Sequence, residues 1–243
     1  MAQRRGDGME LLGFGASGWG PPLLQGAMMT LGLALCTLPF GLLLGLAVAM
    51  AKNSGPIWLG VVCGIYTSLF RALPELLTIL IVYFLGQSAI NALLAALGIG
   101  IQIEVSGFAA GFVALGLVLG AFSSEVWLGA LRSLSRGQRE GAAALGLSRG
   151  QTFRKIILPQ LIRTALPGLG NNWMALLKDT SLVSAIAVSE LMYMTNRAVF
   201  ATKQPLLFYA ACCLLYLVMA ILSGIAQTML ERHFNRGQNL ARV

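Results

Sequence analysis

The chain has 243 residues, of which 57% are hydrophobic and only 11% are charged, whereas charged residues make up about a quarter of a typical soluble protein. This composition excludes an ordinary soluble domain and predicts an integral membrane protein. Membrane topology accounts for the net charge of +8, so no nucleic-acid partner is expected.

The first apolar run begins near the N-terminus and shares only some features of a signal peptide. Arg4 and Arg5 precede it, but it continues for about 30 residues, whereas the apolar core of a signal peptide has roughly 7 to 15. It also lacks a convincing small-residue cleavage site. We therefore expect this run to be retained as the first membrane span.

Charge-free runs predict about five membrane-spanning helices. A helix crosses the hydrocarbon core with about 20 apolar residues. The fourth expected span is the weakest, because proline, glycine and charged residues interrupt it. The expected fold class is an all-α integral membrane protein, organised as one transmembrane domain over residues 1–243. In chain order the expected spans cover about 22–50, 57–86, 107–131, 160–188 and 204–230, with an inner turn at 52–56 and an outer loop at 87–106.

Two of these spans carry pairs of glycines four residues apart. Small residues at this spacing lie on one helix face and allow two backbones to approach closely. We therefore expect a tightly packed helix bundle. The pairs are Gly41 and Gly45, Gly107 and Gly111, and Gly116 and Gly120.

Lysine and arginine are unevenly distributed between the predicted loops. With five spans and the N-terminus outside, eleven of these cations fall on the cytoplasmic side and four outside. This split agrees with the positive-inside rule. We expect the C-terminus in the cytoplasm. The cytoplasmic cations are Lys52, seven residues from Arg132 to Arg163, and Arg232, Arg236 and Arg242.

Several charged residues fall at membrane depth. Each costs about 2.5–3.5 kcal/mol at the centre of a membrane helix, so such residues usually face a cavity or one another. Arg71 and Glu75 are four residues apart on the second span, where Pro74 loosens the helix. They form either a structural ion pair or a polar wall of a substrate path. The candidate path residues are Arg71, Glu75, Glu125, Lys178 and Asp179, and Glu190 is a further charge at this depth.

The Lys178–Asp179 pair lies where the fourth span is interrupted. Adjacent residues do not face one another on a helix, so each of the two needs its own partner. The pair belongs either to a gate or to a subunit interface.

The longest polar stretch, residues 132–163, follows the third span and contains the segment REGAAALGLSRGQTFRKIILP. Its alanine-rich first part favours a helix, and Gly146 ends that helix. A second helix is expected to begin at a Ser148 cap and to end near Pro159.

The second of these helices is expected to be amphipathic. Phe153, Ile156 and Ile157 recur at helical spacing, opposite the cationic residues of the segment. A two-helix elbow of this kind at the inner membrane face predicts a docking element.

Candidates for catalysis are scarce. Every lysine follows a residue other than glycine, so there is no phosphate-binding loop of the form G-x-x-x-x-G-K-[ST]. The single histidine, His233, lies in the charged tail, which leaves no Ser/His/Asp or Cys/His site. We expect no catalytic residue, no ATPase site and no metal site. The cysteines, expected to be small buried hydrophobic residues, are Cys36, Cys63, Cys212 and Cys213.

The elbow resembles the EAA loop of ABC-importer permease subunits, the cytoplasmic segment that seats in a groove of the ATPase subunit. The second position of that motif is usually alanine, and Gly141 is a mild departure from it. The resemblance assigns ATPase coupling to Glu140, Gly141, Ala142, Gly146, Ile156, Leu158 and Pro159.

Three further segments are similar to the polar amino acid branch of these permeases, and the similarity extends over roughly residues 23–231. The nearest relatives are permeases for histidine, arginine and related basic amino acids or opines. The resemblance implies an ABC type I importer permease (MetI-like) fold in a bacterial inner membrane. The segments are FRALPELL (70–77), EVWLGALRSL (125–134) and LPGLGNNWMALLKDTSLVSAI (166–186).

The resemblance also implies the partners. Two ATP-binding cassette subunits would dock on the elbow and bind the ATP, so this chain would need no cofactor of its own. A second permease subunit, either a paralogue or another copy, would complete the pathway, and an extracytoplasmic solute-binding protein would deliver the amino acid.

The substrate is implied less directly. Permeases for basic amino acids tend to carry an acid where Glu75 stands, so Glu75 would contact the cationic end of arginine, histidine, lysine or ornithine. Glutamine, another polar amino acid or an opine is the alternative.

Two other classes of membrane protein are weighed against the permease. An ion-driven secondary transporter usually shows two related halves, and this short chain shows no repeat. A membrane scaffold would explain the elbow but not Glu75 and Lys178.

Overall fold

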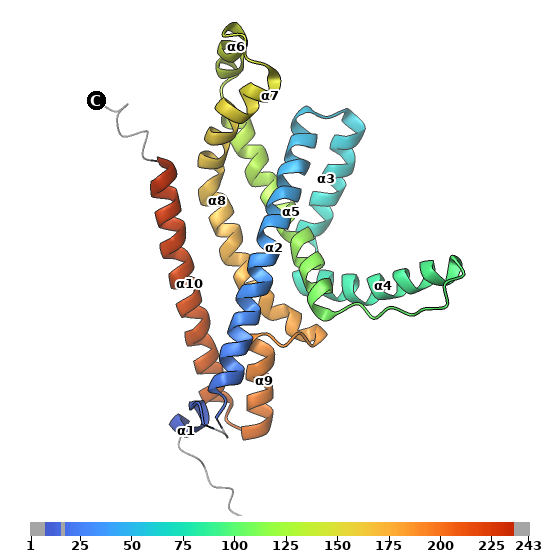
Figure 1. Cartoon of the computed structure of the whole chain (residues 1–243), viewed down its shortest axis with the longest axis vertical. Coiled ribbons are helices and arrows are strands. Elements are labelled where there is room, and N and C mark those ends of the chain that lie inside the picture. The colour runs from blue at the N-terminus through green and yellow to red at the C-terminus, as the bar shows by residue number, and fades with distance from the viewer. Residues whose placement is uncertain (1–7, 16–17, 236–243) are drawn as a thin grey trace, which may run out of the picture. The chain divides into compact units, whose positions relative to one another are not determined.

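The computed structural model describes residues 8–15 and 18–235, and every regular element in this part of the chain is a helix. This confirms the all-α fold class. The helices are α1 (Gly8–Leu12), α2 (Gly20–Ser54), α3 (Ile57–Ala72), α4 (Glu75–Ala96), α5 (Gly107–Ser133), α6 (Arg136–Ala144), α7 (Arg149–Thr152), the π-helical turn η1 (Phe153–Ile157), α8 (Leu158–Asp179), the 3-10 helix η2 (Thr180–Ile186), α9 (Leu191–Thr202) and α10 (Pro205–Asn235) (Figure 1).

Four of the described helices are long and apolar enough to cross a membrane: α2, α4, α5 and α10. The weak fourth span of the sequence corresponds to α8, which contains Pro167 and ends in a Lys-Asp pair. The helix α9 was not expected. It lies between the fourth and fifth expected spans.

The expected second span, 57–86, is wrong as a single helix, because it is divided into α3 and α4. Leu73 adopts an extended conformation, with φ −78° and ψ 141°, as the residue before a proline tends to do. Pro74 then precedes the first residue of α4. Arg71 and Glu75 therefore lie on different helices, and the predicted i, i+4 relation between them does not exist.

The outer loop is also shorter than expected. Helix α4 continues to Ala96, so the connection to α5 covers 97–106 rather than 87–106. The Gln87 side chain is hydrogen-bonded to the backbone of this connection, donating to the Ile103 carbonyl and accepting from the Val105 N–H. The connection is therefore held against α4.

Contacts divide the chain into two compact units, each assembled from three separate stretches. Helices α2, α5, α8 and α10 contribute to both. Organisation as a single domain stays a prediction. The first unit contains Met1–Thr37, Pro74–Leu115 and Leu176–Ile221, and the second contains Leu38–Leu73, Gly116–Ala175 and Leu222–Val243.

In the first unit, close backbone packing depends on glycine. A side chain at Gly26 would meet the backbone of Glu190 and Leu191, and one at Gly107 would meet the Ile186 carbonyl. Large apolar side chains fill the rest of this core. Those with almost no exposed surface include Leu33, Ile79, Leu115, Leu177, Val183, Leu191 and Phe208.

In the second unit, glycines allow α2 to pack directly on α5. A side chain at Gly45 would meet Ser123 and the Gly120 carbonyl, and one at Gly41 would meet Leu119. The close packing expected from two of the glycine pairs, Gly41 with Gly45 and Gly116 with Gly120, therefore occurs between these two helices. The Trp127 indole N–H donates to the Leu42 carbonyl at 3.1 Å and ties the same helices together.

Candidate functional site

The elbow lies in the second unit, between α5 and α8, and consists of α6, α7 and η1 (Figure 1). Gly146 ends α6 with φ +73°, a conformation that favours glycine. Its N–H donates to the Ala143 carbonyl, and the Leu147 N–H donates to the Ala142 carbonyl. This is a Schellman motif, and the predicted break at Gly146 is confirmed.

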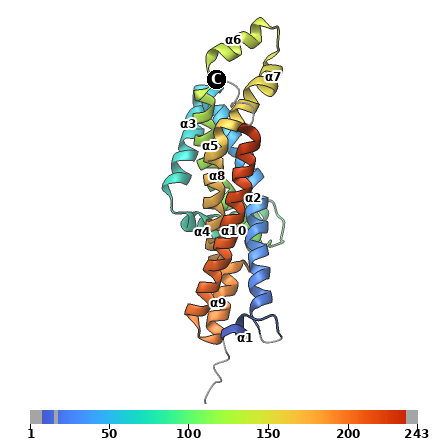
Figure 2. The same cartoon turned by 90° about the vertical axis from the view of Figure 1, so that its left-hand side faces the viewer.

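The predicted cap at Ser148 is also confirmed. The Ser148 hydroxyl accepts from the Gln151 N–H at 3.3 Å, and the Gln151 side chain accepts from the Ser148 N–H at 3.0 Å. This reciprocal capping box stabilises the start of α7. The direction of the chain changes sharply between α6 and α7 (Figure 2).

The second helix of the elbow does not end near Pro159, as the sequence suggested. Instead α7 passes through η1 into α8, which continues to Asp179. In the π-helical turn the Leu158 N–H donates to the Phe153 carbonyl, five residues back. Widening the turn in this way relieves the clash between a proline ring and the carbonyl four residues earlier. Pro159 is therefore accommodated in the first turn of α8.

The predicted coupling residues differ in exposure. Glu140, Gly141, Gly146 and Pro159 are exposed, and Ile156 and Leu158 are half-buried. Ala142 is buried, and so is Ile157, the neighbour of the predicted Ile156. The first four residues are therefore accessible to a partner, whereas Ala142 is packed inside the elbow.

Sequence reasoning missed Leu145 as a candidate contact. This side chain is 80% exposed at the C-terminal end of α6. A large apolar side chain next to the break at Gly146 was the available signal. Leu145 is therefore accessible to a partner.

The base of the elbow is anchored in a hydrophobic core. Ile157 packs with Trp127 and Leu131 of α5, Ala49 of α2 and Leu161 of α8, and Phe153 lies against the same core. A displacement of the elbow would therefore act directly on α2, α5 and α8.

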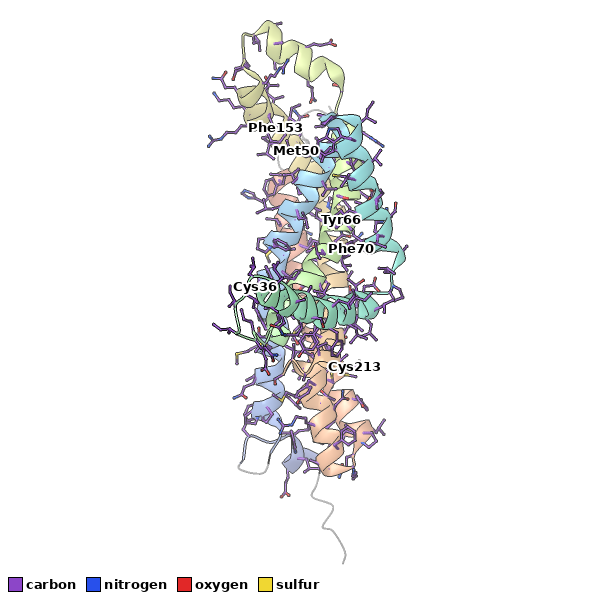
Figure 3. All side chains as sticks on the ribbon, turned by 90° about the vertical axis from the view of Figure 1, so that its right-hand side faces the viewer. Cys36, Met50, Tyr66, Phe70, Phe153 and Cys213 are labelled. Atoms are coloured by element: carbon purple, nitrogen blue, oxygen red, sulfur yellow. The ribbon has the colours of Figure 1, made fainter. Side chains whose placement is uncertain are left out.

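A cavity of about 770 Å³ opens beside this core. Met50 and Phe153 line it, from the end of α2 and from η1 (Figure 3). Leu147, Arg149 and Leu131 line it as well. The cavity therefore lies between the elbow and the ends of α2 and α5.

One group of charged residues links three helices of the second unit. The Lys52 ammonium lies 2.7 Å from Glu125 Oε1 and donates to the Thr67 hydroxyl at 3.0 Å. Arg71 Nη1 lies 4.0 Å from the same carboxylate oxygen, and its guanidinium sits over the Phe122 ring. Glu125 is therefore bound by cations of the chain itself, and Lys52 is a member that sequence reasoning left in an inner turn.

The remaining candidate path residues lie in the first unit. Glu75 is half-buried in the first turn of α4, and its carboxylate is close enough to Asp179 for mutual electrostatic repulsion. Asp179 is half-buried and Lys178 exposed. Within the described residues, none of the three forms an ion pair. The Thr78 hydroxyl, one turn from Glu75, is buried without a hydrogen-bond partner in the same part of the chain.

The Glu190 carboxylate is held by hydrogen bonds within the protein. Its side chain is fully buried and caps α9, accepting from the backbone N–H groups of Met192 at 2.8 Å and Tyr193 at 2.7 Å. The hydroxyls of Thr30 and Tyr216 donate to it at 3.4 and 3.3 Å. Glu190 therefore joins α2, α9 and α10 and has no free face for a substrate.

The cysteines are not uniformly buried. Cys212 is buried, but Cys36 and Cys213 are exposed on apolar helices (Figure 3). The expectation that all four are buried is wrong, because no described residue covers these helix faces. Over the described residues, no group of three or more His, Cys, Asp and Glu side chains is placed to hold a metal ion.

Curated proteins similar to this chain are permeases. This chain is 38% identical to the histidine/lysine/arginine/ornithine transport system permease protein HisQ of Salmonella typhimurium. The identity extends over 220 residues, which are 90% of this chain and 96% of that protein. It is 39% identical to the arginine ABC transporter permease protein ArtQ of Haemophilus influenzae, over 88% of this chain and 94% of that protein. It is 36% identical to the octopine transport system permease protein OccQ of Rhizobium meliloti, over 94% of this chain and 97% of that protein.

Solved structures show the same fold. A crystal structure of an amino acid ABC transporter with histidines aligns with a TM-score of 0.73 and 27% identity, over 88% of this chain and 95% of that chain. An inward-facing structure of the MetNI methionine ABC transporter aligns with a TM-score of 0.70, over 88% of this chain and 96% of that chain. Because the sequence identity is 17%, this structure supports the fold alone.

A family model described as "Binding-protein-dependent transport system inner membrane component" matches residues 23–236. This range includes α3 to α10 entirely and nearly all of α2. Since the elbow and the helices that anchor it all fall within the match, the chain belongs to the inner membrane components of binding-protein-dependent transport systems, the permeases of ABC importers.

Proposed function

We propose that this chain is the permease subunit of an ABC importer for polar amino acids, with basic amino acids as the preferred substrates. The observation that carries the proposal is the exposed elbow of α6 and α7, whose base at Ile157 is packed into the core of α2, α5 and α8. Such an arrangement transmits force from a partner to membrane helices.

In this proposal the ATP is bound and hydrolysed by two ATPase subunits that dock on the elbow. Glu140, Gly141, Gly146 and Leu145 present accessible surface for that contact. Closure of the ATPases would displace the elbow and shift the bundle between two states of access. ATP-bound and ATP-free ATPase subunits would stabilise the two states to different extents. This difference in free energy would drive the change between them.

The other partners follow from the membrane location. A second permease subunit would cover the polar groups that lipid cannot satisfy, and an extracytoplasmic binding protein would deliver the substrate. The excess of lysine and arginine in the expected inner loops supports a topology with the elbow and the C-terminus in the cytoplasm and the N-terminus outside.

A pair of carboxylates in the first unit favours basic amino acids. Glu75 and Asp179 bring two carboxylates close together, and a cationic side chain would relieve their repulsion. Names of relatives include histidine, lysine, arginine, ornithine and the opine octopine, so an opine is the second candidate.

The test is ATP-dependent uptake of radiolabelled arginine, histidine and glutamine into proteoliposomes that contain the complete complex. Wild type is compared with Gly146→Asp and with the control Gly137→Asp. Both glycines have open space for a side chain, but only Gly146 has a positive φ. We expect Gly146→Asp to lower arginine uptake about tenfold or more, in the range of typical coupling free energies, while Gly137→Asp retains it.

Two results would contradict the proposal. Amino acid flux that continues without ATP would favour an ion-driven carrier. Uptake of glutamine in clear preference to arginine and histidine would leave the ABC permease in place but remove the basic substrate class.

A further inference from the structure

We propose that Lys52 and Glu125 are positioning residues for energy coupling, forming a charged link through which movement of the elbow reaches the α2–α3 hairpin. This inference rests on the proposed permease function and adds a residue, Lys52, that neither the coupling motif nor the substrate path contains. Its two partners come from α3 and α5, so one ammonium group joins three helices.

The link lies close to the elbow along both helices. Lys52 stands two residues before the end of α2, and the neighbouring Met50 and Asn53 line the cavity beside Phe153. Glu125 lies about 12 Å before the end of α5 at Ser133, at 1.5 Å per helical residue. Movement of the elbow therefore enters α2 and α5 at their cytoplasmic ends and meets the ion pair within a few turns.

The pair has the geometry of a specific contact. The Lys52 side chain is only 16% exposed and Glu125 36%, and the two atoms are 2.7 Å apart. A surface pair in open water contributes little, but a lysine that donates to both a carboxylate and the Thr67 hydroxyl is restricted in direction. The ion pair thus holds α2 in a defined position relative to α3 and α5.

A second cation allows the link to change. Arg71 of α3 approaches the same Glu125 oxygen at 4.0 Å, a distance at the limit of an ion pair. If α2 moves away from α5, the carboxylate has a replacement partner at hand and is not left unpaired. Exchange of Glu125 between Lys52 and Arg71 supplies two discrete arrangements, which is what energetic coupling between distant sites requires.

Static contacts hold the same helices independently of charge. The Tyr66 hydroxyl donates to the Leu117 carbonyl at 2.6 Å, joining α3 to α5, and Trp127 joins α5 to α2. Loss of the ion pair should therefore leave the hairpin folded. Its effect should appear in coupling rather than in assembly.

The experiment measures substrate taken up per ATP hydrolysed in proteoliposomes of the complete complex. We expect Lys52→Met and Glu125→Gln each to lower this ratio about fivefold or more, while Lys52→Arg preserves it because the charge is kept. The matched control is Lys203→Met, which removes a cation in the first unit. Thermal unfolding of each complex reports stability separately.

The double variant Lys52→Met/Glu125→Gln separates coupling from simple charge neutralisation. It leaves neither member of the pair charged, so a merely structural pair would regain the wild-type ratio in this variant. The positioning role predicts that the ratio stays low. Recovery in the double variant, or an unchanged ratio in Lys52→Met, would overturn the proposal.

If Lys52→Met complexes fail to assemble, Arg71→Met tests the same exchange. Without its replacement partner, Glu125 should remain on Lys52, so the maximal rates of uptake and of substrate-stimulated ATP hydrolysis should fall together. The substrate concentration that gives half-maximal uptake should stay at its wild-type value, whereas loss of a substrate contact at Arg71 would raise it. Wild-type rates in Arg71→Met would reject the exchange. A wild-type complex without ATP-dependent uptake would instead reject the proposed function, so the two failures are distinguishable.

Discussion

At the scale of single residues, charges within apolar helices serve two different purposes. Glu190 is fully buried and accepts hydrogen bonds from two backbone N–H groups, so its role is to join helices. Glu75 is half-buried and forms no ion pair with a described residue. Residues of the second kind are the better candidates for contact with a substrate, because their charge is not already neutralised.

Replacement of Glu75 tests the contact with a cationic substrate. We expect Glu75→Gln to lower the preference for arginine over glutamine about tenfold, since a hydrogen bond to a charged group contributes about 1.5–3 kcal/mol. The measurement is competition between the two amino acids for ATP-dependent uptake. Glu104→Gln, in the exposed connection after α4, is the control. Unchanged selectivity in Glu75→Gln would exclude a direct contact.

Replacement of Glu190 tests its structural role. Glu190→Ala removes the cap of α9 and leaves buried N–H and hydroxyl groups unpaired, so the free energy of unfolding should fall by about 1–2 kcal/mol. Thermal unfolding of the purified protein would show this as a lower midpoint, with Glu104→Ala as the control. An unchanged midpoint combined with lost uptake would instead place Glu190 in the transport path.

At the scale of elements, the elbow combines a rigid base with an accessible tip. The capping box at Ser148 and the Schellman motif at Gly146 define the backbone, and Ile157 anchors it in the core. Short helices of this size are unstable alone, so the core is what preserves their shape. A partner that binds the tip therefore acts on a preformed element.

Leu145 should contribute to docking of the ATPase subunit. Burial of a leucine side chain stabilises a complex by about 1.5–3 kcal/mol, so Leu145→Ser should weaken binding of the ATPase subunit about tenfold. Titration of the ATPase subunit onto the permease in detergent measures this affinity. Ala144→Ser, at the neighbouring exposed position, is the matched control. Equal affinities for Leu145→Ser and wild type would place the interface elsewhere on the elbow.

At the scale of the whole molecule, the chain is two compact units connected by continuous helices. The elbow and the Lys52–Glu125 pair belong to the second unit, and Glu75 and Asp179 belong to the first. Helices α5 and α8 contribute residues to both units. These helices provide covalent routes by which movement at the elbow could influence the acidic group.

Sequence alone was sufficient for the features that depend on local physics. Long charge-free runs need a membrane, a glycine after an alanine-rich helix ends it, and a serine followed by a glutamine three residues later caps the next helix. The all-α fold, the helix break at Gly146 and the cap at Ser148 follow from these patterns, whereas the permease family was indicated by a resemblance of the elbow and three further segments to known permeases. The break between α3 and α4 was also within reach, because Pro74 restricts Leu73.

Only the tertiary structure decided which distant residues meet. Lys52 and Glu125 are 73 positions apart and Glu190 and Thr30 are 160 apart, and no local pattern specifies such pairs. Nor could periodicity show that Ile157 is buried and Ile156 only half-buried. Periodicity assumes about 100° per residue along an α-helix, and the π-helical turn at these residues changes that angle. Local chemistry determined the helix boundaries at Gly146 and Ser148, whereas packing between helices determined which charges are satisfied within the protein and which remain available to a partner or substrate.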